Sequence, residues 1–158
     1  MNRVLSLDEI ADVAETLRNE GKRIVVTNGC FDLLHVGHVR YLAAARSLGD
    51  VLVVGLNGDV SVRTLKGEGR PLNSENDRAE VLAALRSVDY VVIFPEVRAT
   101  AFLERVRPSL YVKGGDYKPE TLDREERAAL LGMGAEIRII PFEHGYSTSQ
   151  LVARMNRA

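Results

Sequence analysis

The chain has 158 residues, of which 46% are hydrophobic and 27% charged, as in an ordinary globular domain. Its 21 basic and 22 acidic side chains leave a net charge of −1, which predicts no broad surface for nucleic acid or membranes. No apolar run approaches the roughly 18 residues of a membrane span, and the acidic N-terminal segment 1–18 does not resemble a signal peptide. Cys30 is the only cysteine, which excludes an intramolecular disulfide. We therefore expect one cytoplasmic domain over residues 1–158.

The first element in chain order is a helix, predicted over 6–21 by apolar residues at helical spacing. Ser6 and Glu9 have the spacing of a capping box, in which each side chain accepts from a backbone N–H of the other. Gly21 can end the helix in a left-handed conformation. A short, almost continuous apolar strand follows at 23–28, of the kind that is buried on both faces.

The alternation of helix and strand continues to the end of the chain. Further strands are predicted at 50–57, 89–94, 109–114 and 135–142, and further helices at 37–49, 74–88, 99–107, 122–134 and 147–156. Val81, Leu82 and Leu85 are expected on one helix face, and segment 57–73, with three glycines and a proline, as a long functional or mobile loop. The pattern predicts an α/β fold, a three-layer Rossmann-like domain with a doubly wound parallel five-stranded sheet.

Polar and glycine-rich segments follow four of the predicted strands. They cover 28–38, 57–73, 113–117 and 143–149. In doubly wound sheets, ligands bind beyond the carboxyl ends of the strands, where the strand order reverses. The four segments are therefore expected to form one site.

The segment 28–38, "NGCFDLLHVGH", contains two of the three histidines of the chain. His35 and His38 flank Gly37 at a predicted helix start, a spacing that places both imidazoles on one face. The helix start presents unpaired N–H groups and a partial positive charge, and Gly29 and Gly37 allow close approach to the backbone. These features favour binding of a nucleotide phosphate.

Two other uses of these residues are less favoured. Two histidines and Asp32 could hold zinc, but a catalytic zinc site usually has a third firm protein ligand, so no protein metal site is predicted. Cys30 as a nucleophile would need a histidine partner, and His144 is distant in sequence. Cys30 is expected to be a small apolar filler.

The segment "GCFDLLHVGH" resembles the G-x-F-D-x-x-H-x-G-H signature of the cytidylyltransferase-like nucleotidyltransferase superfamily. Further similar segments follow in the order of that superfamily: "LKGEGRPLNSENDRAEVLAALRSVDYVV", "LYVKGGDY" and "YSTSQLV". Within it, the chain is most similar to the D-glycero-β-D-manno-heptose 1-phosphate adenylyltransferases. These enzymes make ADP-heptose and pyrophosphate from ATP and the sugar 1-phosphate, for lipopolysaccharide and related glycoconjugates.

The resemblance implies a catalytic role for His35, His38 and Lys66 on the reacting phosphates. The nucleotide contacts that it implies are Gly29, Cys30, Phe31, His38, Lys113, Gly115, Asp116, Tyr146, Ser147 and Thr148. It implies substrate contacts for Asp32, Arg70 and Arg78, with Asp32 orienting either the turn or a substrate group.

For two of these assignments, the neighbouring residues also allow a purely structural role. Arg78 could pair with a phosphate or with a neighbouring carboxylate, Asp77 or Glu75. Ser147 and Gln150 have the spacing of a capping box, while the same helix start with the Ser147 and Thr148 hydroxyls could also cradle a phosphate.

The resemblance also implies partners. Mg²⁺ is expected to enter with ATP and to need few protein ligands. A homodimer is the family expectation. In many bacteria this domain is fused behind a sugar kinase, so the kinase is expected here on a separate chain.

Several rival functions stay open. Enzymes of the same superfamily that make CDP-glycerol, CDP-ethanolamine or FAD share the histidine and serine–threonine motifs. A non-catalytic nucleotide-binding module is the alternative from another class, although it would be expected to lose a histidine or Lys66. Nucleic-acid binding is disfavoured by the near-zero net charge, even though the HxGH turn recurs in class I aminoacyl-tRNA synthetases.

Overall fold

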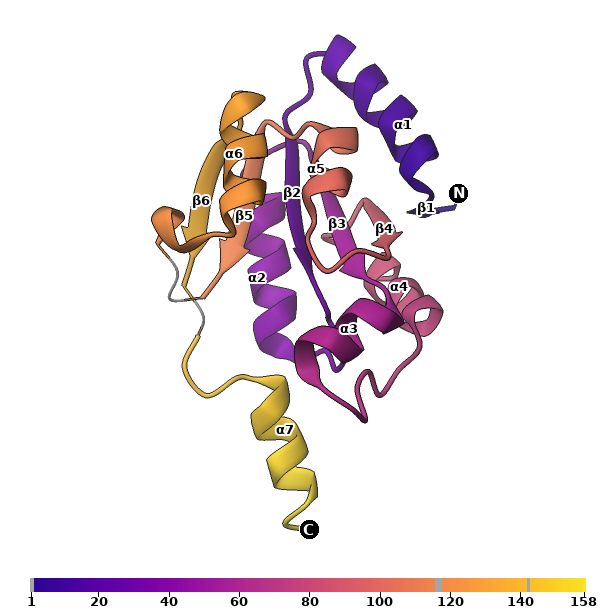
Figure 1. Ribbon diagram of the computed structural model, residues 1–158, viewed down its shortest axis with the longest axis vertical. Helices are drawn as coiled ribbons and strands as arrows, with labels where there is room; N and C mark the ends of the chain where they lie inside the picture. Colours follow the sequence, from indigo (N-terminus) through magenta and orange to yellow (C-terminus); the bar gives the residue numbers. More distant parts are fainter. Residues whose placement is uncertain (1, 116–117, 142) are drawn as a thin grey trace.

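The computed structural model describes residues 2–115, 118–141 and 143–158. Six strands within these ranges form one sheet, every pair parallel, in the order β1-β4-β3-β2-β5-β6 (Figure 1). The strands are β1 (Val4–Leu5), β2 (Ile24–Gly29), β3 (Val51–Asn57), β4 (Tyr90–Phe94), β5 (Leu110–Gly114) and β6 (Glu136–Ile140). The prediction of five strands is therefore wrong by one. The additional strand, β1, pairs with β4 through two residues, too few for a strand pattern in the sequence.

Helices cover both faces of the sheet, which confirms the three-layer α/β architecture (Figure 1). One face packs against α1 (Leu7–Asn19), α5 (Thr100–Val106) and α6 (Arg124–Gly132). The other face packs against α2 (Val36–Arg46) and α4 (Glu75–Ala83). The successive strand residues Val25 and Val26 are both fully buried and belong to opposite core layers, which explains the continuous apolar run in β2.

The strand order places the reversal of the sheet beside β2. From this central strand the chain moves outward to β3 and β4 and then returns to β5 on the other side of β2. Val25 and Val26 of β2 lie in register with Leu110 and Tyr111 of β5. The segments that follow β2 and β5 therefore emerge next to each other, at the position expected for a ligand.

Part of the predicted loop 57–73 is a helix, α3 (Asp59–Lys66). This prediction is wrong because the segment is short and rich in β-branched residues, and it buries only Ser61 and Val62. Of the apolar residues expected on one face of α4, Leu82 is fully buried, whereas Val81 is 53% exposed. The Ser6–Glu9 capping box of α1 is confirmed.

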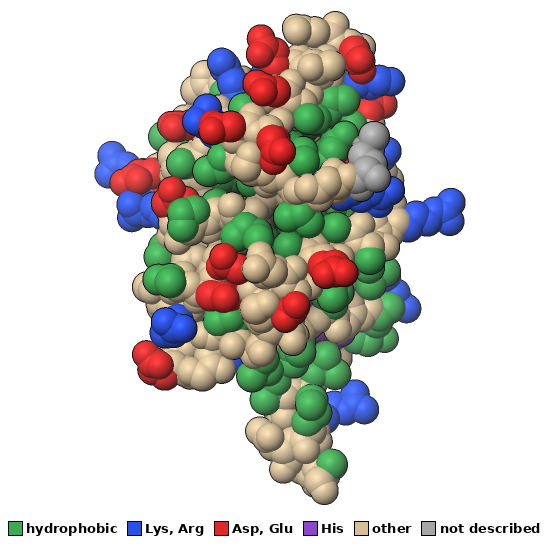
Figure 2. Space-filling view, turned by 90° about the vertical axis from the view of Figure 1, so that its right-hand side faces the viewer, with side chains coloured by type: hydrophobic (Ala, Val, Ile, Leu, Met, Phe, Trp, Pro, Cys, Tyr) green, Lys and Arg blue, Asp and Glu red, His purple; other side chains and the backbone are tan. Residues whose placement is uncertain are grey.

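The last helix, α7 (Thr148–Met155), projects from the body of the domain (Figure 1). Figure 2 shows hydrophobic side chains on this helix and at its junction with the body, and Met155 is 68% exposed. A short 3-10 helix, Pro119–Thr121, precedes α6. Within the described residues, each helix is too short or too polar to traverse a lipid bilayer.

Gly55 is needed for the contact between β3 and α5. A Cβ atom at this position would lie 2.5 Å from Cε1 of Phe102, a fully buried ring on α5. We predict that Gly55→Ala lowers the free energy of unfolding by about 1–3 kcal/mol through overpacking. Chemical denaturation with urea measures this, and Gly132→Ala on α6, where nothing lies within 4 Å of the added Cβ, is the matched control. Equal stability of Gly55→Ala and wild type would contradict the prediction.

Candidate active site

The turn from β2 to α2 is a strained backbone supported by an aromatic ring. Phe31 has a φ of 45°, a left-handed conformation that non-glycine residues rarely adopt. Its buried ring contacts the His38 ring edge-on, with centroids 5.6 Å apart. A Cβ at Gly29 would lie 3.0 Å from the Phe31 ring, so the glycine leaves room for this packing. The Phe31 ring in turn holds the imidazole of His38.

The two histidines cap α2 with their own rings. The N–H of Gly37 donates to Nδ1 of His35 (3.1 Å), and the N–H of His35 donates to Nδ1 of His38 (3.3 Å). Because both Nδ1 atoms accept, a neutral imidazole at either position carries its proton on Nε2. The rings lie side by side with centroids 4.0 Å apart. The helix start therefore offers two Nε2–H donors, on rings whose planes are tilted by 33°.

Both imidazoles are disposed to stay uncharged. Burial, together with the charge of His35, lowers the pKa of His38 to about 4. Burial also lowers the pKa of His35. Near neutral pH both imidazoles can therefore donate a hydrogen bond while carrying no net charge. Such donors can orient a bound anion, and the charge of the anion is then balanced by another group.

The carboxylate of Asp32 is occupied within the protein. It accepts the backbone N–H groups of Leu72 and Asn73 and pairs with Nε of Arg70 at 2.8 Å. Burial alone would raise the pKa of Asp32, but these hydrogen bonds outweigh it and hold the pKa below its ordinary value. Asp32 therefore orients the turn, which is one of the two roles expected for it. Contact of Arg70 with substrate stays a prediction.

Lys66 ends α3, and Gly67 follows it with a φ of 98°. The side chain of Lys66 is exposed. Burial raises the pKa of the Cys30 thiol, and the positive charges of Lys66 and Arg78 act on it in the opposite direction. Lys66 therefore lies near enough for its charge to act on the turn that contains Cys30. It does so from the end of helix α3, whereas the sequence predicted a loop at this position.

The start of α7 lies against the turn that precedes α2. Thr148 Oγ1 donates to the carbonyl of Leu33 (2.9 Å), and Ser147 caps α7 by accepting from Gln150 N–H. The Tyr146 ring stacks near His35, with centroids 6.3 Å apart and 22° between the ring planes. The guanidinium of Arg40 lies over the Tyr146 ring, 5.6 Å from the ring centroid. The histidine turn and the serine–threonine motif thus meet, as the sequence predicted.

The residues after β5 lie beside the same edge. Lys113 is half-buried within β5, and the N–H of Gly115 donates to the carbonyl of Ile140 (3.0 Å). That N–H is engaged in the sheet, so contact of Gly115 with a nucleotide would use its Cα or carbonyl. Asp116, the remaining predicted contact, lies outside the described residues.

Arg78 is placed differently from a substrate ligand. Its side chain has no exposed surface, and its partners are backbone carbonyls and Asp59, so pairing with Asp77 or Glu75 is not the arrangement found. Asn57 and Asp59, which together with Glu75 surround the start of α3, were not predicted as site residues. The only sequence signal for these two residues is their position at the end of β3 and the start of α3.

The fold and this site together define a three-layer α/β domain with an HxGH turn at the switch point of its sheet. The cytidylyltransferase-like family matches residues 26–154, which include the turn, α3 and most of α7. The chain belongs to this family and is a nucleotidyltransferase.

Two relatives and one solved structure extend the comparison. The chain is 48% identical over 156 residues to bifunctional protein HldE of Geobacter metallireducens, covering 99% of this chain and 31% of the relative. It is 49% identical over 148 residues to bifunctional protein HldE of Syntrophotalea carbinolica, covering 94% and 30%. The fold is similar to the lipopolysaccharide core biosynthesis protein of Thermoplasma volcanium, with a TM-score of 0.64, 28% identity, and coverage of 78% of this chain and 98% of that one. The chain thus spans under a third of the length of these curated relatives.

The low pKa of His38 makes the stability of the fold depend on pH. Between about pH 4 and the ordinary histidine pKa of about 6.5, the unfolded chain binds a proton at this residue and the folded chain does not. We therefore predict that the free energy of unfolding falls as the pH is lowered through this window. Urea denaturation at a series of pH values measures it.

His38→Gln should show a smaller loss of stability than wild type across the same window. His144→Gln, which changes an exposed histidine, is the control and should keep the wild-type profile. Parallel profiles for His38→Gln and wild type would show that His38 titrates normally in the folded protein.

Proposed function

We propose that the protein joins ATP and D-glycero-β-D-manno-heptose 1-phosphate to give ADP-heptose and pyrophosphate. An oxygen of the sugar phosphate attacks the α-phosphorus of ATP in line, the new P–O bond forms, and the bond from the α-phosphorus to the bridging oxygen breaks. The observation that carries the proposal is the pair of Nε2–H donors of His35 and His38 at the start of α2.

The geometry suits a reaction that needs no general base. The second pKa of a phosphate monoester is about 6, so the attacking oxygen is already ionised near neutral pH. The barrier then falls through alignment and through donors aimed at the charge that develops on the phosphorus oxygens. The proposal gives this task to the two histidines and to Lys66, with the Ser147 and Thr148 hydroxyls at the remaining phosphates.

Mg²⁺ fits this site as a cation carried by the phosphates of ATP. Among residues 2–115, 118–141 and 143–158, no three side chains of His, Cys, Asp or Glu gather as a metal site. The Asp32 carboxylate in the turn is taken by Arg70 and two backbone N–H groups. Bound Mg²⁺ would neutralise phosphate charge, while the described residues orient the nucleotide.

The choice of acceptor depends on similarity more than on geometry. Near 48% identity over almost the whole chain to bifunctional HldE proteins, and the "VKGGDY" and "KGEGRP" segments, favour the heptose phosphate. A sugar kinase would supply that acceptor, and a homodimer stays a prediction. Glycerol 3-phosphate, ethanolamine phosphate and FMN are the competing acceptors of the superfamily.

A pyrophosphate-release assay tests the assignment. ATP, CTP, GTP and UTP are each paired with heptose 1-phosphate, glycerol 3-phosphate, ethanolamine phosphate and FMN in the presence of Mg²⁺. We expect release with ATP and heptose 1-phosphate. If pyrophosphate were released only with another pair, the proposed substrates would be wrong but the enzyme class would stand. If no pair released pyrophosphate, the result would favour a non-catalytic nucleotide-binding module.

The direction of the imidazole protons predicts which substitution at His38 retains activity. His38→Ala should lower kcat by about 100- to 1,000-fold, the cost of losing one donor to transition-state charge. His38→Gln places an amide N–H near the original Nε2 and should retain more activity than His38→Asn, whose shorter amide reaches only the Nδ1 position. Steady-state kinetics measures kcat, and circular dichroism checks the fold. Wild-type turnover in His38→Ala would remove the histidine from the mechanism.

A further inference from the structure

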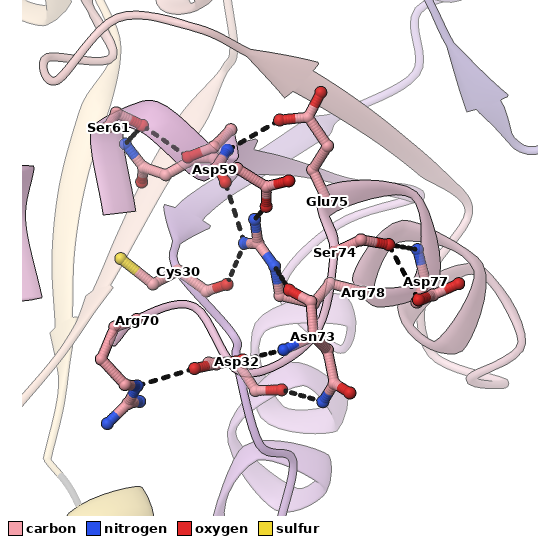
Figure 3. Close-up of polar contacts among 12 residues, drawn as sticks. Cys30, Asp32, Asp59, Ser61, Arg70, Asn73, Ser74, Glu75, Asp77 and Arg78 are labelled. Atoms are coloured by element: carbon pink, nitrogen blue, oxygen red, sulfur yellow. Dashed lines mark hydrogen bonds and ion pairs between the residues drawn. The ribbon is translucent and has the colours of Figure 1, made fainter. Parts of the chain in front are cut away.

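A fully buried arginine at α4 connects the segments that surround the proposed phosphate site (Figure 3). Nη1 of Arg78 donates to the carbonyls of Cys30 (2.6 Å) and Asn57 (2.8 Å). Nε donates to the carbonyl of Asn73 (3.0 Å), and Nη2 pairs with Oδ1 of Asp59 (2.8 Å). One guanidinium thus joins the turn after β2, the end of β3, the start of α3 and the loop before α4.

The start of α3 has a second support from α4. Oε2 of Glu75 accepts the backbone N–H of Asp59 (2.7 Å), and Asn57 Nδ2 donates to Ser61 Oγ (3.3 Å) within the first turn of the helix. In Figure 3, Glu75 and Arg78 both approach Asp59 from α4. The first turn of α3 is therefore held by side chains on two sides.

The chain beyond α3 is tied to the same turn by Asp32. Its carboxylate accepts from the backbone of Leu72 and Asn73 and from Arg70, and Asn73 Nδ2 donates to the carbonyl of Asp32 (3.0 Å). Segment 59–73 is consequently fastened to the β2 turn at both of its ends. Lys66 lies between the two attachments.

We propose that Arg78 is a positioning residue that holds Lys66 at the phosphate turn and does not itself bind substrate. The inference rests on the proposed function, which gives Lys66 its contact with the phosphates. A planar guanidinium can reach carbonyls in several directions at once, whereas the single ammonium of a lysine cannot reproduce that fork. Arg78→Lys therefore keeps the charge but loses part of the connection.

The first test compares Arg78→Lys with wild type by kinetics, using the substrate pair on which wild type turns over. We expect kcat to fall about 10- to 100-fold, because a small displacement of a catalytic group has costs of this size. KM for either substrate should change by less than about threefold, since no ground-state contact is removed. Arg86→Lys, an exposed arginine just after α4, is the control and should match wild type.

The second test reads the position of α3 without substrate. Amide hydrogen exchange of residues 59–66 in the ligand-free protein should be faster in Arg78→Lys than in wild type and Arg86→Lys. This measurement does not depend on the reaction. If wild type turned over no substrate pair, the proposed function would fail while the exchange data still decided the positioning role.

A double-mutant cycle separates positioning from a general structural effect. If Arg78 acts through Lys66, the double variant Arg78→Lys/Lys66→Gln should have a kcat within about threefold of Lys66→Gln alone. If the fold losses in kcat of the two single variants multiplied in the double variant, Arg78 would act independently of Lys66, and the inference would be overturned.

Two further outcomes bear on the role of Arg78. A rise of more than about tenfold in KM for one substrate, with unchanged exchange in α3, would make Arg78 a substrate ligand and overturn the inference. Should Arg78→Lys fail to fold, Asp59→Ala takes its place, because it removes the partner of Nη2 and leaves Arg78 itself intact. Faster exchange in α3 with a lower kcat would then support positioning, and wild-type values would contradict it.

Discussion

The parallel pairing of β2 with both β3 and β5 determines where this protein can bind a ligand. β2 lies in register with β3 from Ile24 to Gly29 and with β5 at Val25 and Val26. Because every pair is parallel, all carboxyl ends reach the same edge, and helices cover both faces of the sheet. Polar side chains can therefore gather only where the strands end, and the reversal beside β2 leaves space between two of these ends.

Backbone groups that leave the sheet at this edge still need hydrogen-bond partners. Two side chains of opposite charge meet that need in complementary ways. Asp32 supplies acceptors for the N–H groups of Leu72 and Asn73, while Arg78 supplies donors for the carbonyls of Cys30 and Asn57. Segment 67–73 has almost no regular structure, and its order depends on these buried contacts.

Local patterns were enough to predict most of the fold. The apolar run at 23–28 and the Ser6–Glu9 capping box each depend on neighbours within a few residues, and both predictions are confirmed. β1 and α3 were missed because a two-residue strand and a short helix with little buried surface carry no periodic pattern. Their stability comes from contacts with distant parts of the chain.

The same distinction applies to the site. Spacing alone predicted that His35 and His38 share a helix start, and resemblance predicted that Tyr146, Ser147 and Thr148 lie beside them. The partners of Arg78 were not predictable, because the carbonyl of Cys30 lies 48 positions away along the chain. A sequence shows that an arginine is present, whereas only the fold shows whether any part of it remains exposed.

At the turn that contains His35 and His38, hydrogen-bond geometry and charge come from different parts of the chain. The directions of the two imidazole donors follow from the N–H groups of His35 and Gly37, so they are set locally by the start of α2. Burial keeps those donors neutral, and positive charge is supplied from outside the turn by side chains such as Lys66. Local capping can orient a donor but cannot place a charge that arrives from another helix. The location of that charge depends on long-range contacts, and the buried guanidinium of Arg78 provides them at the start of α3.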